Sequence, residues 1–89
     1  MKLQIQSPNG IETAMDSVQA IRTRLIDGKP LTLMPSHAPL MGEIGNQTIT
    51  VVSNHHERSF HVSSGVLYIA DDVVRVLTNG MTQEEDQVE

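Results

Sequence analysis

The chain has 89 residues, of which 38% are hydrophobic and 2% aromatic, which suits one small domain with an aliphatic core. It contains no cysteine, which excludes disulfide frameworks, zinc sites built from thiolates and a cysteine nucleophile. The formal net charge is −5, but 4 of the 11 acidic residues follow Gly80. Residues 1–80 therefore hold 7 acidic and 6 basic residues, and these basic residues are too few to form a nucleic-acid-binding face.

The first part of the chain reads as strands and tight turns. Leu3 and Ile5 alternate with polar residues, the period of two that is typical of a half-buried strand. Asn9-Gly10 then predicts a hairpin turn. The return run, residues 11–21, changes the phase of its apolar positions near Asp16-Ser17, which predicts a bulge there.

A second turn and a stiff loop follow. Asp27-Gly28 predicts the turn, and residues 33–40 read Leu-Met-Pro-Ser-His-Ala-Pro-Leu. Each proline fixes its own φ at about −65° and restricts the residue before it, so this segment is a rigid loop that presents His37. We expect Met15 and Met34 to fill gaps in the core, while Met41 is open to either a core or a binding role.

The second half repeats the strand pattern. Residues 48–52 are β-branched at every position, which predicts a strand. Residues 59–62 alternate polar and apolar side chains, which also indicates a strand. Residues 66–70 and 73–77 are apolar runs joined by Asp71-Asp72, which we interpret as solvated turn residues. Residues 81–89 are polar and acidic and predict a tail that is disordered or begins a short helix.

Strand-like runs recur at intervals of about 8–12 residues with turn residues between them. No helix-length amphipathic stretch comes before residue 80. The spacing predicts an all-β fold, a flattened β-sandwich or barrel of roughly ten short antiparallel strands over residues 1–80, with residues 81–89 as a separate tail.

Several segments, taken in order, are similar to a known family. The proline loop closely resembles the Leu-Pro-Gly-His-Ala-Pro-Leu loop of the N-terminal β-sandwich domain of the F-type ATP synthase epsilon subunit. Residues 60–67, Phe-His-Val-Ser-Ser-Gly-Val-Leu, resemble its Phe-Ala-Val-Ser-Gly-Gly-Phe-Leu. Residues 2–5, 16–18 and 73–77 resemble three of its strands. The resemblance covers nearly all of residues 1–80 and lacks the family's C-terminal helical hairpin, which carries its inhibitory action.

The resemblance implies a non-catalytic subunit of the rotating central stalk, with no cofactor or metal. Such a subunit binds the gamma subunit and rests on the loops of the c-ring, coupling proton or sodium movement to ATP synthesis or hydrolysis. On the gamma side the matched motifs imply Ser7, His37, Met41 and Gly42. On the ring side the turn beside the proline loop implies Asp27, Gly28 and Lys29.

The resemblance also implies a place in the cell, the cytoplasmic face of the bacterial plasma membrane, as a peripheral member of the complex. No apolar run approaches the ~18 residues of a membrane span, and the first residues lack the pattern of a secretory signal. We therefore expect no direct insertion into the membrane.

The alternative is a free-standing small β-sandwich that binds a ligand or metal through the His55–His61 region. A zinc site needs three or four ligands that converge on one point, and two adjacent histidines in a turn rarely do so. An enzyme has little support. A serine nucleophile needs a base and an orienting group, and around Ser64 the Gly-x-Ser-x-Gly spacing is absent.

Overall fold

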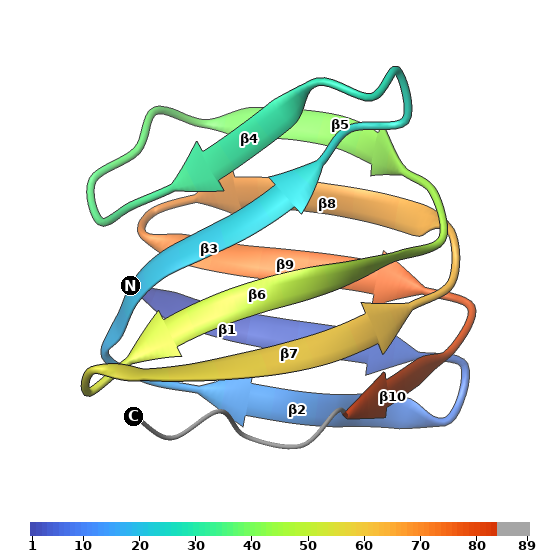
Figure 1. Cartoon of the computed structure of the whole chain (residues 1–89), viewed down its shortest axis with the longest axis horizontal. Helices are drawn as coiled ribbons and strands as arrows, with labels where there is room; N and C mark the ends of the chain where they lie inside the picture. Colours follow the sequence, from blue (N-terminus) through green and yellow to red (C-terminus); the bar gives the residue numbers. More distant parts are fainter. Residues whose placement is uncertain (84–89) are drawn as a thin grey trace.

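The computed structural model describes residues 1–83, and these residues form ten β-strands and no helix (Figure 1). The strands are β1 (Lys2–Ser7), β2 (Gly10–Met15), β3 (Val18–Arg24), β4 (Pro30–Leu33), β5 (Leu40–Ile44), β6 (Gln47–Ser53), β7 (His56–Val62), β8 (Gly65–Ala70), β9 (Val73–Thr78) and β10 (Met81–Gln83). Sheet A has the order β2-β1-β9-β8-β5, and sheet B has the order β10-β7-β6-β3-β4. The two sheets pack face to face, so the predicted all-β sandwich is confirmed.

One strand pair differs from the predicted antiparallel arrangement. β1 and β9 run parallel, from Lys2 opposite Val73 to Gln6 opposite Leu77. The other strand pairs within residues 1–83 are antiparallel. A parallel pair needs a long connection to return the chain to the same end of the sheet, and residues 8–72 supply it.

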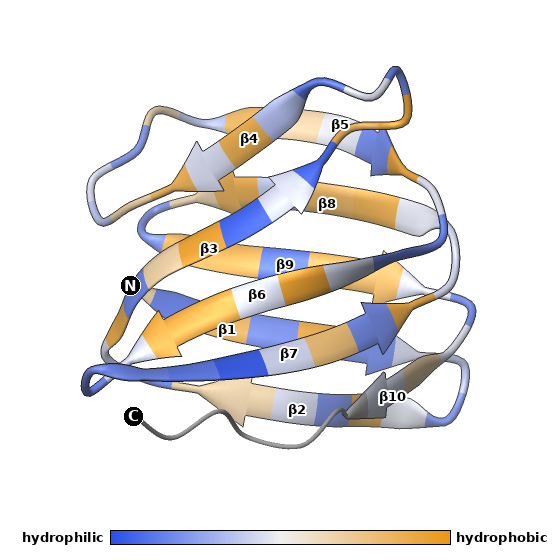
Figure 2. Cartoon of the chain, viewed as in Figure 1, coloured by the Kyte–Doolittle hydropathy of each residue, from blue (hydrophilic) through white to orange (hydrophobic). Residues whose placement is uncertain are grey.

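The core lies between the sheets and comes from alternate positions along the strands, as the colours of β6 illustrate (Figure 2). Each sheet contributes seven side chains that are at most 1% exposed. Sheet A provides Leu3, Ile5, Ile44, Leu67, Ile69, Val74 and Val76, and sheet B provides Val18, Ile21, Leu33, Ile49, Val51, Phe60 and Val62. Met15 packs against this core as predicted.

The run 11–21, predicted to be one strand with a bulge, is instead divided between the sheets. β2 pairs with β1 in sheet A, whereas β3 pairs with β4 and β6 in sheet B. The chain crosses over at Asp16-Ser17, where Ser17 has a φ of 56°. The apolar phase changes there because β3 buries its side chains from the opposite side of the core.

The predicted tail begins with a strand. β10 pairs with β7, with Met81 opposite Val62, and the N–H of Ser63 donates a 2.9 Å hydrogen bond to the carbonyl of Gly80. Backbone pairing of this kind is available to a polar sequence, so sheet B extends past the predicted boundary at residue 80. The expectation of disorder or a helical start is wrong for residues 81–83, and for residues 84–89 it lies outside the described part.

Candidate functional site

The proline loop, residues 34–39, leads from β4 of sheet B to β5 of sheet A across one end of the sandwich (Figure 1). Its first turn closes with a 3.2 Å hydrogen bond from the N–H of His37 to the carbonyl of Met34. Pro35 at the second position and Ser36 at the third, with a φ of 68°, make this a type II turn. Glycine is the usual third residue, and a serine there costs about 1–2 kcal/mol of strain.

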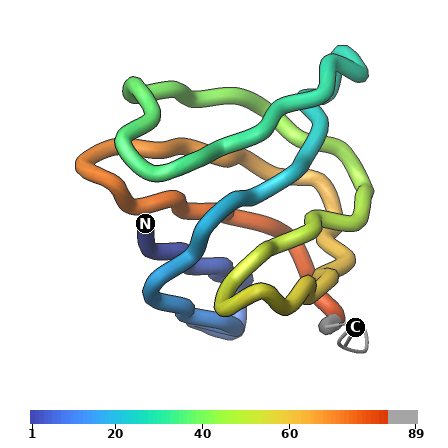
Figure 3. The backbone as a smooth tube through the Cα atoms, turned by 60° about the vertical axis from the view of Figure 1, so that its left-hand side comes forward, coloured from blue at the N-terminus to red at the C-terminus, as the bar shows by residue number. Residues whose placement is uncertain are grey.

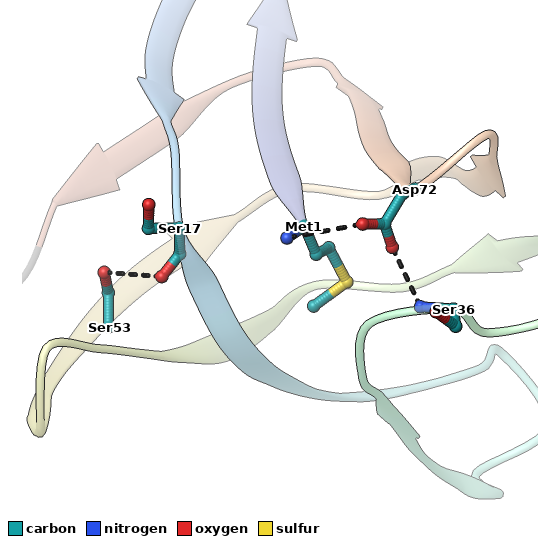
Figure 4. Close-up of polar contacts among 5 residues, drawn as sticks. All are labelled: Met1, Ser17, Ser36, Ser53 and Asp72. Carbon is teal, nitrogen blue, oxygen red and sulfur yellow. Dashed lines mark hydrogen bonds and ion pairs between the residues drawn. The ribbon is translucent and has the colours of Figure 1, made fainter.

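Asp72, in the turn between β8 and β9, contacts this loop. Its Oδ1 accepts a 2.9 Å hydrogen bond from the N–H of Ser36, and its Oδ2 lies 3.5 Å from the N-terminal amine of Met1 (Figure 4). The Ser36 N–H holds the pKa of the Asp72 carboxyl below its usual value, partial desolvation opposes this, and the Met1 ammonium adds to the lowering. In Figure 3 the green loop and the orange β8–β9 turn lie on the same side as the N-terminus.

His37 is half-buried, and its ring is oriented by its own loop. Its Nδ1 lies 2.7 Å from the carbonyl oxygen of Ala38. Because a carbonyl oxygen can only accept, Nδ1 carries a proton, which fixes the tautomer of the neutral form of the ring and makes Nε2 the acceptor of that form. The loop therefore offers a ring of defined tautomer for recognition.

Met34, the first residue of the loop, and Met41, shortly after it in β5, are both exposed, by 56% and 74% respectively. The prediction that Met34 fills the core is wrong, because the inward position belongs to its neighbour Leu33, the last residue of β4. Met41 lies on the outer face of sheet A, opposite Tyr68 of β8. Of the two roles that the sequence left open for Met41, its exposure excludes the core role.

Gly42 makes room for a side chain of the β3–β4 connection. A β-carbon at residue 42 would lie 2.7 Å from Cδ2 of Leu25. Next to it, the N–H of Ile26 donates a 2.9 Å hydrogen bond to the carbonyl of Glu43. The connection thus folds over the edge of β5, so Gly42 has a packing role inside the domain.

The outer face of sheet A carries exposed apolar side chains among polar and charged ones. Ile11, Met41 and Leu77 are exposed by 61%, 74% and 42% respectively. Tyr68 stands between Met41 and Arg75 in the cross-strand register, and the Arg75 guanidinium lies 5.9 Å from the centre of the Tyr68 ring. Met41, Tyr68 and Arg75 thus form one row across this face, and Ile11 and Leu77 lie outside that row.

The predicted ring-side residues form an ordered, exposed turn. The N–H of Lys29 donates a 3.0 Å hydrogen bond to Oδ1 of Asp27, and Gly28 has a φ of 89°. Arg24 donates a 3.0 Å hydrogen bond from its side chain to the carbonyl of Gly28. The Lys29 ammonium lies 3.8 Å from Asp27, a pair exposed enough to contribute little to stability. The two charges are therefore available to a partner.

Ser7 lies apart from the other predicted gamma-side residues. It is only 8% exposed, and its Oγ accepts a 3.1 Å hydrogen bond from the N–H of Asn9 in the β1–β2 turn. That turn is at the opposite end of the sandwich from the proline loop, and β9 and β8 separate β1 from β5 (Figure 1). The structure brings together Met41, Gly42 and the loop that carries His37, but not Ser7.

The histidines of the alternative interpretation do not converge. His55 lies in the turn before β7, with a φ of 63°, and His56 begins the strand opposite Ser53. His61 lies five residues further along, opposite Thr48, a separation of about 17 Å along a strand. Among the described residues no group of three or more His, Cys, Asp or Glu side chains could hold a metal ion.

Sequence reasoning missed the role of Asp72. The sequence marks it as a turn residue, and the positive φ angles of Asp71 (51°) and Asp72 (62°) confirm the turn. Its contact with Ser36 spans 36 positions, and no local pattern reveals such a partner.

None of the described residues forms a helix with the length and hydropathy that a membrane span requires.

A family model described as "ATP synthase, Delta/Epsilon chain, beta-sandwich domain" matches residues 1–84. The ATP synthase epsilon chain of Solibacter usitatus (strain Ellin6076) is 29% identical over 86 residues, which cover 97% of this chain and 63% of that protein.

Two solved structures have the same fold. A chain of the Euglena gracilis mitochondrial ATP synthase (OSCP/F1/c-ring, rotational state 1) superposes with a TM-score of 0.82 at 17% identity, covering 91% of this chain and 51% of that one. A chain of the Tetrahymena thermophila mitochondrial ATP synthase (central stalk/c-ring) superposes with a TM-score of 0.73 at 12% identity. The match covers 92% of this chain and 65% of that one. This chain therefore spans about half to two thirds of the length of its relatives.

Proposed function

Because the chain belongs to the ATP synthase delta/epsilon chain β-sandwich family, we propose that it is a non-catalytic central-stalk subunit of an F-type ATP synthase. In this role it binds the gamma subunit and rests on the c-ring loops, at the cytoplasmic face of the bacterial plasma membrane. It thereby helps to couple proton or sodium movement to ATP synthesis or hydrolysis. The family match over residues 1–84 is the observation that carries the proposal.

The core suits a passive mechanical part. Fourteen aliphatic or aromatic side chains between the sheets are at most 1% exposed, so the sheets are joined by close packing over their whole inner faces. Such interiors have low compressibility and transmit strain. A stalk subunit of this kind transmits torque without chemistry of its own.

The gamma contact is assigned to the outer face of sheet A and the adjoining proline loop. Ile11, Met41 and Leu77 supply exposed apolar area there, which a permanent partner would cover. His37 supplies a directional acceptor at the edge of that area. Gly42 supports the contact by letting Leu25 cover the edge of β5, and Ser7 supports it by closing the β1–β2 turn.

The ring contact is assigned to the turn of Asp27, Gly28 and Lys29. Both charged side chains are exposed, and the turn is held by backbone bonds within it and to β5. An ordered turn with two opposite charges suits the polar loops of another protein, because charge complementarity sets orientation more than affinity.

The gamma assignment is tested by measuring the affinity of the full chain for the purified gamma subunit. Met41→Glu and His37→Ala should each weaken binding by at least about tenfold, because Met41→Glu puts a charge on the apolar area and His37→Ala removes a hydrogen-bonding group. Thr32→Glu adds the same charge on the outer face of sheet B and should bind as the wild type does. Equal affinities for Met41→Glu and Thr32→Glu would count against this face.

The ring assignment needs the assembled complex. Lys29→Glu should reduce retention of the chain on membranes that contain the c-ring and gamma, because it reverses the charge that faces the ring loops. Arg22→Glu makes the same change of charge on the outer face of sheet B, outside both assigned contacts, and is the matched control. Unchanged retention of Lys29→Glu would remove this residue from the interface.

A further inference from the structure

The proline loop contains a backbone conformation that its own sequence does not favour. Ser36 has a φ of 68°, in the left-handed region that L-residues other than Gly, Asn and Asp rarely adopt. The Pro35-Ser36 pair suits a type I turn better, because the third residue of that turn has a negative φ. Something outside the loop must therefore select the type II form.

The two turn types differ in the direction of the central peptide group. Changing from type II to type I rotates the Pro35–Ser36 peptide plane by roughly 150–170°, as the ideal dihedral angles require. The N–H of Ser36 would then point away from its present acceptor, which is Oδ1 of Asp72 at 2.9 Å (Figure 4). A hydrogen bond to a carboxylate is about twice as strong as one between neutral groups.

The acceptor itself is held in place. Asp71 and Asp72 both have positive φ, which is the geometry of a type I′ turn between β8 and β9. The backbone carbonyl of Asp72 also accepts a 3.0 Å hydrogen bond from the N–H of Lys2. The carboxylate is thus anchored to the interior strands β9 and β1 of sheet A, not to the loop that it contacts.

We propose that Asp72 is a positioning residue for the partner-binding loop: its carboxylate selects the type II turn at Ser36 and so fixes the loop that carries His37. This role rests on the proposed function, because the partner is the gamma subunit. A loop fixed before binding avoids the ordering cost that a loop sampling two turn types meets on association.

A glycine at residue 36, as in the family loop that this segment resembles, adopts a positive φ without strain. In this chain, serine at 36 and aspartate at 72 form a pair in which the second residue compensates for the first. The pair predicts a specific rescue. Loss of the carboxylate should matter while residue 36 is serine and should matter much less when it is glycine.

The test uses the full chain and four variants. Asp72→Gly removes the carboxylate and leaves Asp-Gly, a favoured type I′ sequence, so the hairpin should still form. Asp71→Gly changes the net charge equally in the same turn and is the control. Ser36→Gly and the double variant Ser36→Gly/Asp72→Gly complete the cycle.

Two quantities are measured for each protein. The nuclear Overhauser effect between Pro35 Hα and the Ser36 amide proton is strong in a type II turn and weak in type I. The dissociation constant for the purified gamma subunit reports the loop's role in binding. Asp72→Gly should lose the strong effect and bind about tenfold more weakly, as expected when only about a tenth of the molecules hold the competent turn. Asp71→Gly should match the wild type, and the double variant should recover both quantities.

The contrary outcomes are distinct. A strong Overhauser effect that persists in Asp72→Gly would overturn the selection of the turn by Asp72. A lost effect with unchanged gamma affinity would overturn the positioning role and leave the proposed function intact. A double variant that stays weak would show that the loss comes from releasing Met1, the other partner of Asp72, and would also overturn the inference. Failure of the wild-type chain to bind gamma would instead overturn the proposed function, and the loop's role in binding with it.

Discussion

Gly65, the first residue of β8, lies so close to β9 that a β-carbon there would overlap the carbonyl oxygen of Leu77. The obstacle is backbone, which cannot move without breaking the pairing of Gly65 with Thr78. Gly65→Ala should therefore lower the free energy of unfolding by at least about 2 kcal/mol, measured by urea denaturation.

Gly45, between β5 and β6, is the matched control. A β-carbon there meets no atom within 4 Å. Gly45→Ala should change the free energy of unfolding by less than about 1 kcal/mol. Equal stability of the two variants would contradict the close approach of β8 and β9.

Gln47, the first residue of β6, uses its side-chain amide to extend the pairing with β3. Its Oε1 accepts a 2.8 Å hydrogen bond from the hydroxyl of Thr23 and one of 2.9 Å from the N–H of Arg24, and its Nε2 donates to the Arg24 carbonyl at 2.7 Å. Thr23 is only 6% exposed, so Gln47→Ala leaves a buried hydroxyl without this acceptor. The variant should lose about 1–3 kcal/mol, measured by urea denaturation.

Thr23→Val tests whether the unpaired Thr23 hydroxyl causes the loss of stability in Gln47→Ala. Valine has nearly the same shape as threonine but no hydroxyl. Because removing both partners costs less than removing one, Thr23→Val should raise the stability of the Gln47→Ala protein. Gln19→Ala, which removes only a 3.4 Å contact with the His55 N–H on the surface, should stay within about 0.5 kcal/mol of the wild type. A Gln47→Ala/Thr23→Val protein that is less stable than Gln47→Ala would argue against this explanation.

The bond between Asp72 and Ser36 should depend on pH in the acid range. The Ser36 N–H lowers the pKa of Asp72 in the folded protein relative to the usual value of 3.8. A lowered folded-state pKa means that the contribution is fully present above pH 3.8 and is lost as the pH falls through the folded pKa, below 3.8. The chemical shift of the Ser36 amide proton should therefore titrate with a midpoint below 3.8.

Asp72→Gly is the control for this titration, and its Ser36 amide shift should be flat over the same range. A wild-type midpoint above 3.8, or a curve unchanged by Asp72→Gly, would mean that the carboxylate does not bind this N–H in solution.

Much of the fold follows from local patterns. The β-branched run 48–52 lies within β6, and the hairpin predicted at Asn9-Gly10 joins β1 to β2, with Ser7 opposite Gly10. These features depend on side-chain shape and turn chemistry within a few residues, so the sequence displays them directly. The alternation of apolar residues likewise predicts which side of each strand enters the core.

The remaining features depend on partners that are distant in the sequence. The phase change at Asp16-Ser17 is visible locally, but a bulge and a crossover between sheets produce the same pattern. The parallel pairing of β1 with β9 joins residues about seventy positions apart and leaves no local trace. For the same reason, the resemblance predicted the proline loop as a site but not the residue that holds it, Asp72.

The most direct test of the central-stalk assignment is to purify the affinity-tagged full chain from detergent-solubilised membranes of the cells that make it. The account predicts that gamma and c-ring subunits co-purify in a fixed ratio with the wild-type chain and that Met41→Glu reduces their yield. A chain recovered alone, while the ATP synthase isolated from the same membranes lacks it, would contradict the account.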